Sequence, residues 1–179
     1  MQSAQISGTA DDLGEAQGWT DAATLRYVVA DPKTGFDDII AFGAAGVYVS
    51  MGQDPSTHNG QPFGQLYLAM AEFGSDQGWS VGKTPRLIGD VNGDGIPDIV
   101  GFGDSSVFVA VGSRDSSGNL QFKVDPTKTI GDFGAVEGWS GKDLQTVRAL
   151  GNVTGTGSGS GHSDLILSGA FNTQVWHFT

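Results

Sequence analysis

The clearest chemical signal in the sequence is one run of oxygen-bearing side chains, Asp-Val-Asn-Gly-Asp-Gly-Ile-Pro-Asp, which begins at Asp90. Asn92 and Asp94 alternate with small or apolar residues, a glycine follows, and Asp98 closes the run. Such a loop can wrap a hard cation with these four side chains and the backbone carbonyl of Ile96. A flexible loop with many oxygens suits the larger ion, so the spacing predicts calcium rather than magnesium. An Asp/Asn/Gly turn without metal is the alternative.

A second group of residues recurs three times and has the chemistry of a small sugar pocket. Sugars are held by an aromatic face and a few directed hydrogen bonds, in pockets that are small and preformed. Each copy has a tryptophan, an arginine shortly after it and a Gln or Glu two residues before it. The candidate glycan-binding residues are Trp19, Trp79, Trp139, Arg26, Arg86, Arg148, Gln17, Gln77 and Glu137. Alternatively, each tryptophan wedges neighbouring repeats together, with the arginine stacked on it.

These residues belong to a tandem repeat that fills the chain. The sequence Leu-Gly-Glu-Ala-Gln-Gly-Trp at 13–19 returns as Phe-Gly-Ser-Asp-Gln-Gly-Trp at 73–79 and as Phe-Gly-Ala-Val-Glu-Gly-Trp at 133–139. Asp-Ile-Ile-Ala-Phe-Gly at 38–43 likewise matches 98–103, and more loosely 164–169. Much of the glycine content, 29 residues, therefore marks turns that recur at a fixed interval.

The repeat predicts an all-β fold. Segments such as 87–89, 99–102, 107–111 and 120–124 are rich in β-branched and aromatic residues and are bounded by turn residues. Repeated units of four short strands are typical of β-propeller blades. We expect blade 1 at about 9–68, blade 2 at about 69–128, and blade 3 at 129–179 completed by a strand from 1–8.

Three blades per chain predict assembly, because propellers typically need four to eight blades to close. The third copy stops at its third strand, and the N-terminus supplies an unmatched strand at 5–7. We therefore expect a six-bladed homodimer in which each N-terminal strand completes the last blade of the other chain. The alternative is a fragment of a longer single-chain propeller.

Composition excludes several classes of protein. The chain has 179 residues with 38% hydrophobic content, enough for a core, and its 20 acidic against 9 basic residues disfavour nucleic acid as a partner. Zero cysteines exclude disulfides, thiolate metal sites and cysteine nucleophiles. Apolar runs of about five residues fall short of the roughly 20 that span a bilayer, so no membrane insertion is expected.

The other two copies of the acidic loop depart from the calcium pattern. At 31–38 the loop is one residue shorter, and Lys33 stands where Asn92 does, so a lysine could neutralise the carboxylates there. At 152–164 two carboxylates are lost around a Gly/Ser-rich insertion. The sequence therefore predicts about one calcium per chain, with a structural role.

The middle copy resembles an FG-GAP/VCBS repeat through its acidic loop, the following Asp-Ile-Val-Gly-Phe-Gly and the next strand. These repeats occur in integrin-type propellers and in propeller lectins. The added Phe-Gly-x-x-x-Gly-Trp element is most similar to the Psathyrella velutina lectin type and its Photorhabdus relatives. The resemblance implies a calcium-containing propeller that binds monosaccharide units of glycans in repeated pockets on one face.

On these grounds we predict a non-enzymatic, multivalent lectin whose partners are glycans or glycoconjugates and a second copy of the chain. No histidine stands beside a recognisable Ser or Asp partner for catalysis. The alternatives are an integrin-like propeller that binds protein, and an accessory or catalytic propeller of a polysaccharide-degrading system. Localisation stays open: the polar start does not resemble a signal peptide, and a leaderless lectin could act in the cytosol or after unconventional release.

Overall fold

The structure is a computed structural model that describes residues 13–20, 24–131, 133, 147–153, 162–168 and 173–178. Its regular elements are eleven β-strands and three short 3-10 helices, and no α-helix occurs among the described residues. The predicted all-β class is therefore confirmed for this part of the chain. No described helix has the length and apolarity needed to cross a membrane.

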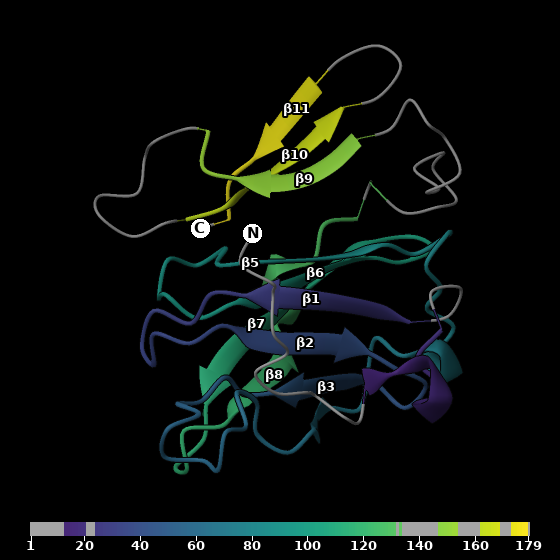
Figure 1. Ribbon diagram of the computed structural model, residues 1–179. Helices are drawn as coiled ribbons and strands as arrows, with labels where there is room; N and C mark the ends of the chain where they lie inside the picture. The colour runs from purple at the N-terminus through teal and green to yellow at the C-terminus, as the bar shows by residue number, and fades with distance from the viewer. Residues whose placement is uncertain are drawn as a thin grey trace, which may run out of the picture.

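The strands form three antiparallel sheets, one per repeat, each with its strands in sequence order (Figure 1). Sheet 1 contains β1 (Leu25–Val29), β2 (Asp38–Phe42), β3 (Val47–Ser50) and β4 (Tyr67–Met70). Sheet 2 contains β5 (Arg86–Gly89), β6 (Asp98–Phe102), β7 (Val107–Arg114) and β8 (Leu120–Val124). Sheet 3 contains β9 (Val147–Gly151), β10 (Asp164–Ser168) and β11 (Thr173–Trp176). The 3-10 helices are η2 (Glu15–Gln17), η3 (Ser75–Gln77) and η4 (Pro126–Lys128).

Successive side chains of a strand point to opposite sides, so each sheet has two faces. Both faces carry apolar side chains. We call the side that packs toward the following repeat the forward face and the opposite side the backward face. Ile40 and Phe42 of β2 lie on the forward face of sheet 1, whereas Ile39 and Ala41 lie on its backward face. Strand β6 is buried at all five positions because sheet 2 is covered on both faces.

Two core clusters join the three sheets in succession. The first lies between the forward face of sheet 1 and the backward face of sheet 2, and includes Ile40, Phe42, Val47, Val49, Ile99, Ala110 and Phe122. The second lies between the forward face of sheet 2 and the backward face of sheet 3, and includes Val100, Phe102, Val107, Val109, Leu165 and Leu167. Successive sheets packed face to face in this way are consistent with a propeller-like fold.

The sheet-edge strands are also linked between repeats. The Tyr27 hydroxyl of β1 donates to the carbonyl of Arg86 in β5 (2.7 Å), and the Tyr67 hydroxyl of β4 donates to the carbonyl of Leu120 in β8 (3.0 Å). The predicted strands of the middle repeat are confirmed, and β7 runs on to Arg114 because it pairs there with β8. The predicted N-terminal strand at 5–7 lies outside the described residues.

Candidate functional site

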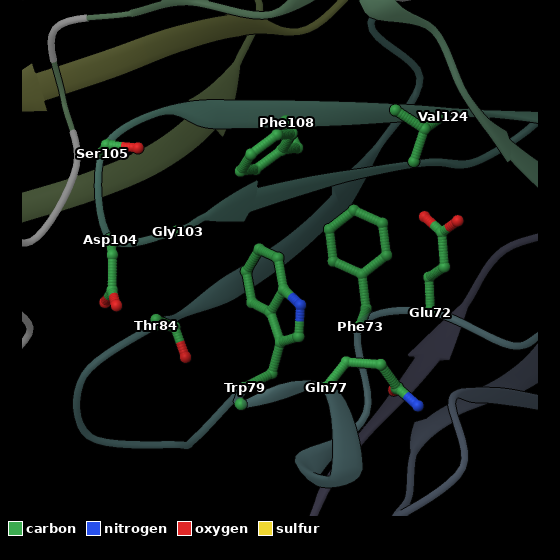
Figure 2. Close-up of a pocket in the computed structure, with 11 residues that line it drawn as sticks. Glu72, Phe73, Gln77, Trp79, Thr84, Gly103, Asp104, Ser105, Phe108 and Val124 are labelled. Atoms are coloured by element: carbon green, nitrogen blue, oxygen red, sulfur yellow. The ribbon is translucent and has the colours of Figure 1, made fainter.

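A pocket of about 550 Å³ opens beside Trp79 in the middle repeat. Its size is within the range of pockets that bind small molecules, about 300–1,000 Å³. The wall combines aromatic rings with carboxylate, hydroxyl and amide groups (Figure 2). The lining residues are Glu72, Phe73, Gln77, Gly78, Trp79, Thr84, Gly103, Asp104, Ser105, Phe108 and Val124.

The Trp79 indole lies between the aromatic and the hydroxylic sides of this pocket (Figure 2). It packs against Phe73 with ring centroids 4.6 Å apart and meets Phe108 edge-on at 6.2 Å. Thr84 and Asp104 lie across the indole from Phe73. An apolar ring flanked by hydrogen-bonding groups is the arrangement that a sugar requires, since a sugar presents both C–H faces and hydroxyls.

Helix η3 and the residues around it fix the position of Trp79. Gly78 adopts the left-handed conformation (φ 87°), so the chain turns back and the Trp79 N–H reaches the carbonyl of Gly74 at 3.2 Å. The side-chain oxygen of Gln77 accepts a hydrogen bond from the Gly74 N–H at 2.9 Å. Gln77 thus lines the pocket and also braces the turn that carries the tryptophan.

Phe73 holds an unusual backbone conformation at the pocket wall. Its φ is 64°, in the left-handed region that bulky residues rarely occupy. Its carbonyl accepts a hydrogen bond at 2.9 Å from Nη1 of Arg86, which holds this segment against β5. Strained conformations of this kind concentrate at binding sites, where the surrounding contacts maintain them.

Arg86 supports the pocket from behind and does not line it. Its side chain is 1% exposed and its guanidinium lies 5.0 Å from the Phe42 ring centroid and 6.0 Å from that of Trp79. Burial lowers the pKa of Arg86 to about 10, so the group stays protonated at neutral pH. Arg86 is therefore a buried cation stacked between two repeats.

The first repeat arranges the equivalent residues differently. Trp19 is 8% exposed and packs edge-on against Tyr48 at 5.6 Å, within a small core cluster. Nη1 of Arg26 donates to the carbonyls of Leu13 (3.0 Å) and Trp19 (2.8 Å). Gln17 is exposed in η2. In this repeat the tryptophan packs as part of the core.

The third repeat is only partly described. Trp139 and Glu137 lie outside the described residues, whereas Arg148 stacks over Phe102 of the second repeat at 4.9 Å. This stack repeats the contact between Arg86 and Phe42. The structure therefore brings Trp79 and Gln77 together in a pocket and places Arg86 and Arg148 between sheets.

Sequence reasoning missed most of the polar pocket wall, namely Glu72, Thr84, Asp104 and Ser105. Asp104 and Ser105 follow Phe-Gly in the middle repeat, where the first repeat has Ala44 and Ala45. This replacement of two alanines by polar residues is the feature of the sequence that could have indicated a polar pocket wall in the middle repeat. Lys83 pairs with Asp104 at 2.6 Å, and both side chains are largely exposed.

The acidic loop of the middle repeat forms a tight set of turns. The Asp90 carboxylate accepts hydrogen bonds from the backbone N–H groups of Gly93 and Gly95, and Asp94 accepts one from Ile96. Asp98 is fully buried, and its two oxygens accept from the N–H groups of Val91 and Gly112. No cluster of three or more His, Cys, Asp or Glu side chains suited to a metal occurs among the described residues.

Burial raises the pKa of Asp98 to about 6, and the neighbouring charges of Asp94 and Asp90 act in the same direction. The negative charges of Asp94 and Asp90 therefore disfavour the ionised form of Asp98. Among the described residues, no Lys, Arg or His forms an ion pair with any of them.

The equivalent aspartates of the other repeats each have a nitrogen-bearing partner. In the first repeat, Arg114 lies 2.6 Å from Asp31 and 4.0 Å from Asp38. In the third, Nδ1 of His177 lies 2.8 Å from Asp164. The cation beside Asp31 is thus Arg114 from the neighbouring repeat, whereas Lys33 contributes only its backbone N–H.

Comparison with known proteins finds similarity to a solved structure. Neither a protein family nor a curated protein matches this sequence. A solved structure of a lectin from Agrocybe aegerita matches with a TM-score of 0.70 and 34% identity over 90% of this chain. That structure is described as specific recognition of non-reducing terminal N-acetylglucosamine. This chain resembles a propeller-like lectin in sequence as well as in fold, and spans 36% of the neighbour's length.

Proposed function

We propose that this protein is a carbohydrate-binding lectin and that the pocket beside Trp79 receives the sugar. The observation that carries the proposal is the indole placed between an aromatic wall and the polar groups of Thr84, Asp104 and Ser105. The resemblance to a lectin at 34% identity supports the same class of ligand. Terminal N-acetylglucosamine is the first probe to use, because the similar lectin binds it.

In this proposal recognition is multivalent and non-catalytic. Each copy of the chain contributes the Trp79 pocket, and assembly of copies places several pockets on one molecule. Weak pockets gain avidity when several of them engage one glycan-covered surface. Glu72 and Asp104, the two carboxylates of the pocket, act as hydrogen-bond acceptors for sugar hydroxyl or amide groups.

We also propose that the acidic loop of the middle repeat binds one structural calcium ion. Asp90, Asn92, Asp94, the Ile96 carbonyl and Asp98 would hold it, because hard oxygen donors are the ligands that calcium prefers. Support comes from the comparison of repeats: Arg114 or His177 stands beside the equivalent aspartates, while the charges of Asp94 and Asp90 act on Asp98 in the middle repeat. When bound, the ion would neutralise this repulsion.

A glycan array with monosaccharide competition tests the proposed function. We expect wild-type protein to bind a defined group of glycans, and free N-acetylglucosamine to compete if it is the ligand. Trp79→Ala should weaken binding about tenfold or more, a loss of ~1.4 kcal/mol. Trp176→Ala is the matched control, because it removes a half-exposed tryptophan outside the pocket. Absence of binding to every glycan, with and without calcium, would contradict the proposal.

A further inference from the structure

The two outermost sheets each expose an apolar face. On the backward face of sheet 1, Val28 is 69% exposed and Leu68 is 44% exposed. On the forward face of sheet 3, Val147 is 54% exposed and Val175 is 46% exposed. Both faces belong to regular, paired strands, so the exposure is a property of the sheets themselves.

The same repeat positions are buried inside the chain. Val175 pairs with Ile166 as Val49 pairs with Ile40 and Val109 with Val100, and Val49 and Val109 are both fully buried on forward faces. Val28 occupies the position of Ile88, which packs against the core between sheets 1 and 2. The two exposed faces are therefore the two complementary halves of an interface that the chain already builds twice.

The arginine that recurs in each repeat is likewise covered inside the chain and uncovered on sheet 1. Arg86 is 1% exposed because the forward face of sheet 1 covers it, and Arg148 stacks on Phe102 of sheet 2. Arg26 has the same position in sheet 1, on the face that no described sheet of this chain covers, and it is exposed. Arg26 thus marks the place where a further forward face would pack.

We propose that the backward face of sheet 1 binds the forward face of sheet 3 of a second copy of this chain. The partner must supply a forward face, and the chain itself carries a matching one. Rings of this architecture contain four to eight sheets, and six is the only multiple of three in that range. Two copies joined by two identical head-to-tail contacts therefore close the ring.

The closing contact is more polar than the internal ones. Ser168 stands where the internal interfaces have Phe42 and Phe102, and its hydroxyl accepts a hydrogen bond from Thr173 at 3.0 Å. Arg26 would therefore meet two hydroxyl groups in place of an aromatic ring. The guanidinium keeps hydrogen-bonding partners there but loses the cation–π contact of the internal interfaces. This makes the closing interface the point at which the ring opens first.

Light scattering coupled to size exclusion tests the assembly. We expect wild-type protein to have twice the chain mass of 18.5 kDa. Val28→Lys and Val175→Glu should each give a monomer, because each buries a charge in one of the two closing faces. Ser116→Glu, in the exposed turn between β7 and β8, is the matched control and should remain dimeric. A wild-type mass of one chain would overturn the proposal. A dimer mass for both Val28→Lys and Val175→Glu would overturn it as well.

Mixing the two monomeric variants distinguishes a head-to-tail contact from a symmetric one. The Val28→Lys chain keeps an intact forward face, and the Val175→Glu chain keeps an intact backward face. We expect the mixture to recover mixed dimers through that one intact contact. Two variants that fail to complement, while each keeps a native circular dichroism spectrum, would refute the pairing of these two faces. The result does not depend on sugar binding, so the assembly and the proposed function can fail separately.

Discussion

At the residue scale, the role of a recurring side chain depends on what the neighbouring positions supply. Trp79 and Trp19 occupy the same place in successive repeats, yet Trp79 lines a pocket and Trp19 is buried. The first repeat has Tyr48 where the second has Phe108, and alanines where the second has Asp104 and Ser105. The pocket in the middle repeat thus depends on substitutions around an unchanged tryptophan.

Arg86 is expected to act on the pocket through the residues that it positions. Arg86→Met keeps most of the side-chain volume but removes the donor to the Phe73 carbonyl and the cation behind Trp79. We expect weaker sugar binding together with a lower melting temperature. Arg86→Ala should be worse, costing about 2–4 kcal/mol of unfolding free energy because it leaves a cavity between the sheets.

Calorimetric melting and sugar titration of the same variants check this expectation. Lys123→Met is the matched control, since it removes an exposed cation of the same sheet and should change neither quantity. If Arg86 contacted the sugar directly, Arg86→Met would abolish binding with an unchanged melting temperature. That outcome would contradict the positioning role.

At the element scale, the acidic loops illustrate how much of this fold can be read from sequence. The strands could be predicted because β-branched and aromatic runs between glycine turns recur at a fixed interval. The repeated Asp38, Asp98 and Asp164 could also be found, as the first residues of β2, β6 and β10. Their partners could not, because Arg114 and His177 come from other strands or other repeats and only packing brings them close.

The same limit applies to the pocket. Trp79 and Gln77 were predictable from the repeat, whereas Glu72 and Asp104 reach the pocket from separate loops. Arg86 recurs as regularly as the tryptophan, and its position in the repeat gave no indication of whether it faces the pocket or the core. Arg86 is buried between Phe42 and Trp79 only because two repeats pack against each other, and that packing cannot be seen in the sequence of one repeat.

Calcium is expected to stabilise the loop of the middle repeat. The ion would offset the repulsion that Asp94 and Asp90 exert on Asp98, so added calcium should raise the melting temperature of wild-type protein and chelator should lower it. Asp94→Ala should abolish this response, because it removes one oxygen ligand. Differential scanning calorimetry with calcium and with chelator makes the measurement.

Glu15→Ala is a suitable control for the calcium response, since it removes an exposed carboxylate in η2, far along the chain from the loop. This variant should respond to calcium as the wild type does. A wild-type melting temperature that is identical in calcium and chelator would contradict the proposed metal site.

At the scale of the whole molecule, the described part of the chain contains three sheets that share one mode of packing (Figure 1). The sheet interfaces and the pocket use the same repeated elements, because the segment that carries Trp79 also contacts the preceding repeat. The N–H groups of Ser75 and Asp76 donate to the carbonyls of Gly43 and Ala44 at 3.2 and 3.0 Å. Packing of one repeat against the previous one therefore helps to hold the pocket residues in place.

Isothermal titration calorimetry with the monosaccharide that competes best on the array is the most direct test of the central claim, that the Trp79 pocket binds sugar. We predict saturable binding to the wild type and to Trp176→Ala, and an affinity at least about tenfold lower for Trp79→Ala, which corresponds to ~1.4 kcal/mol. Equal affinity for the wild type and a correctly folded Trp79→Ala would contradict it.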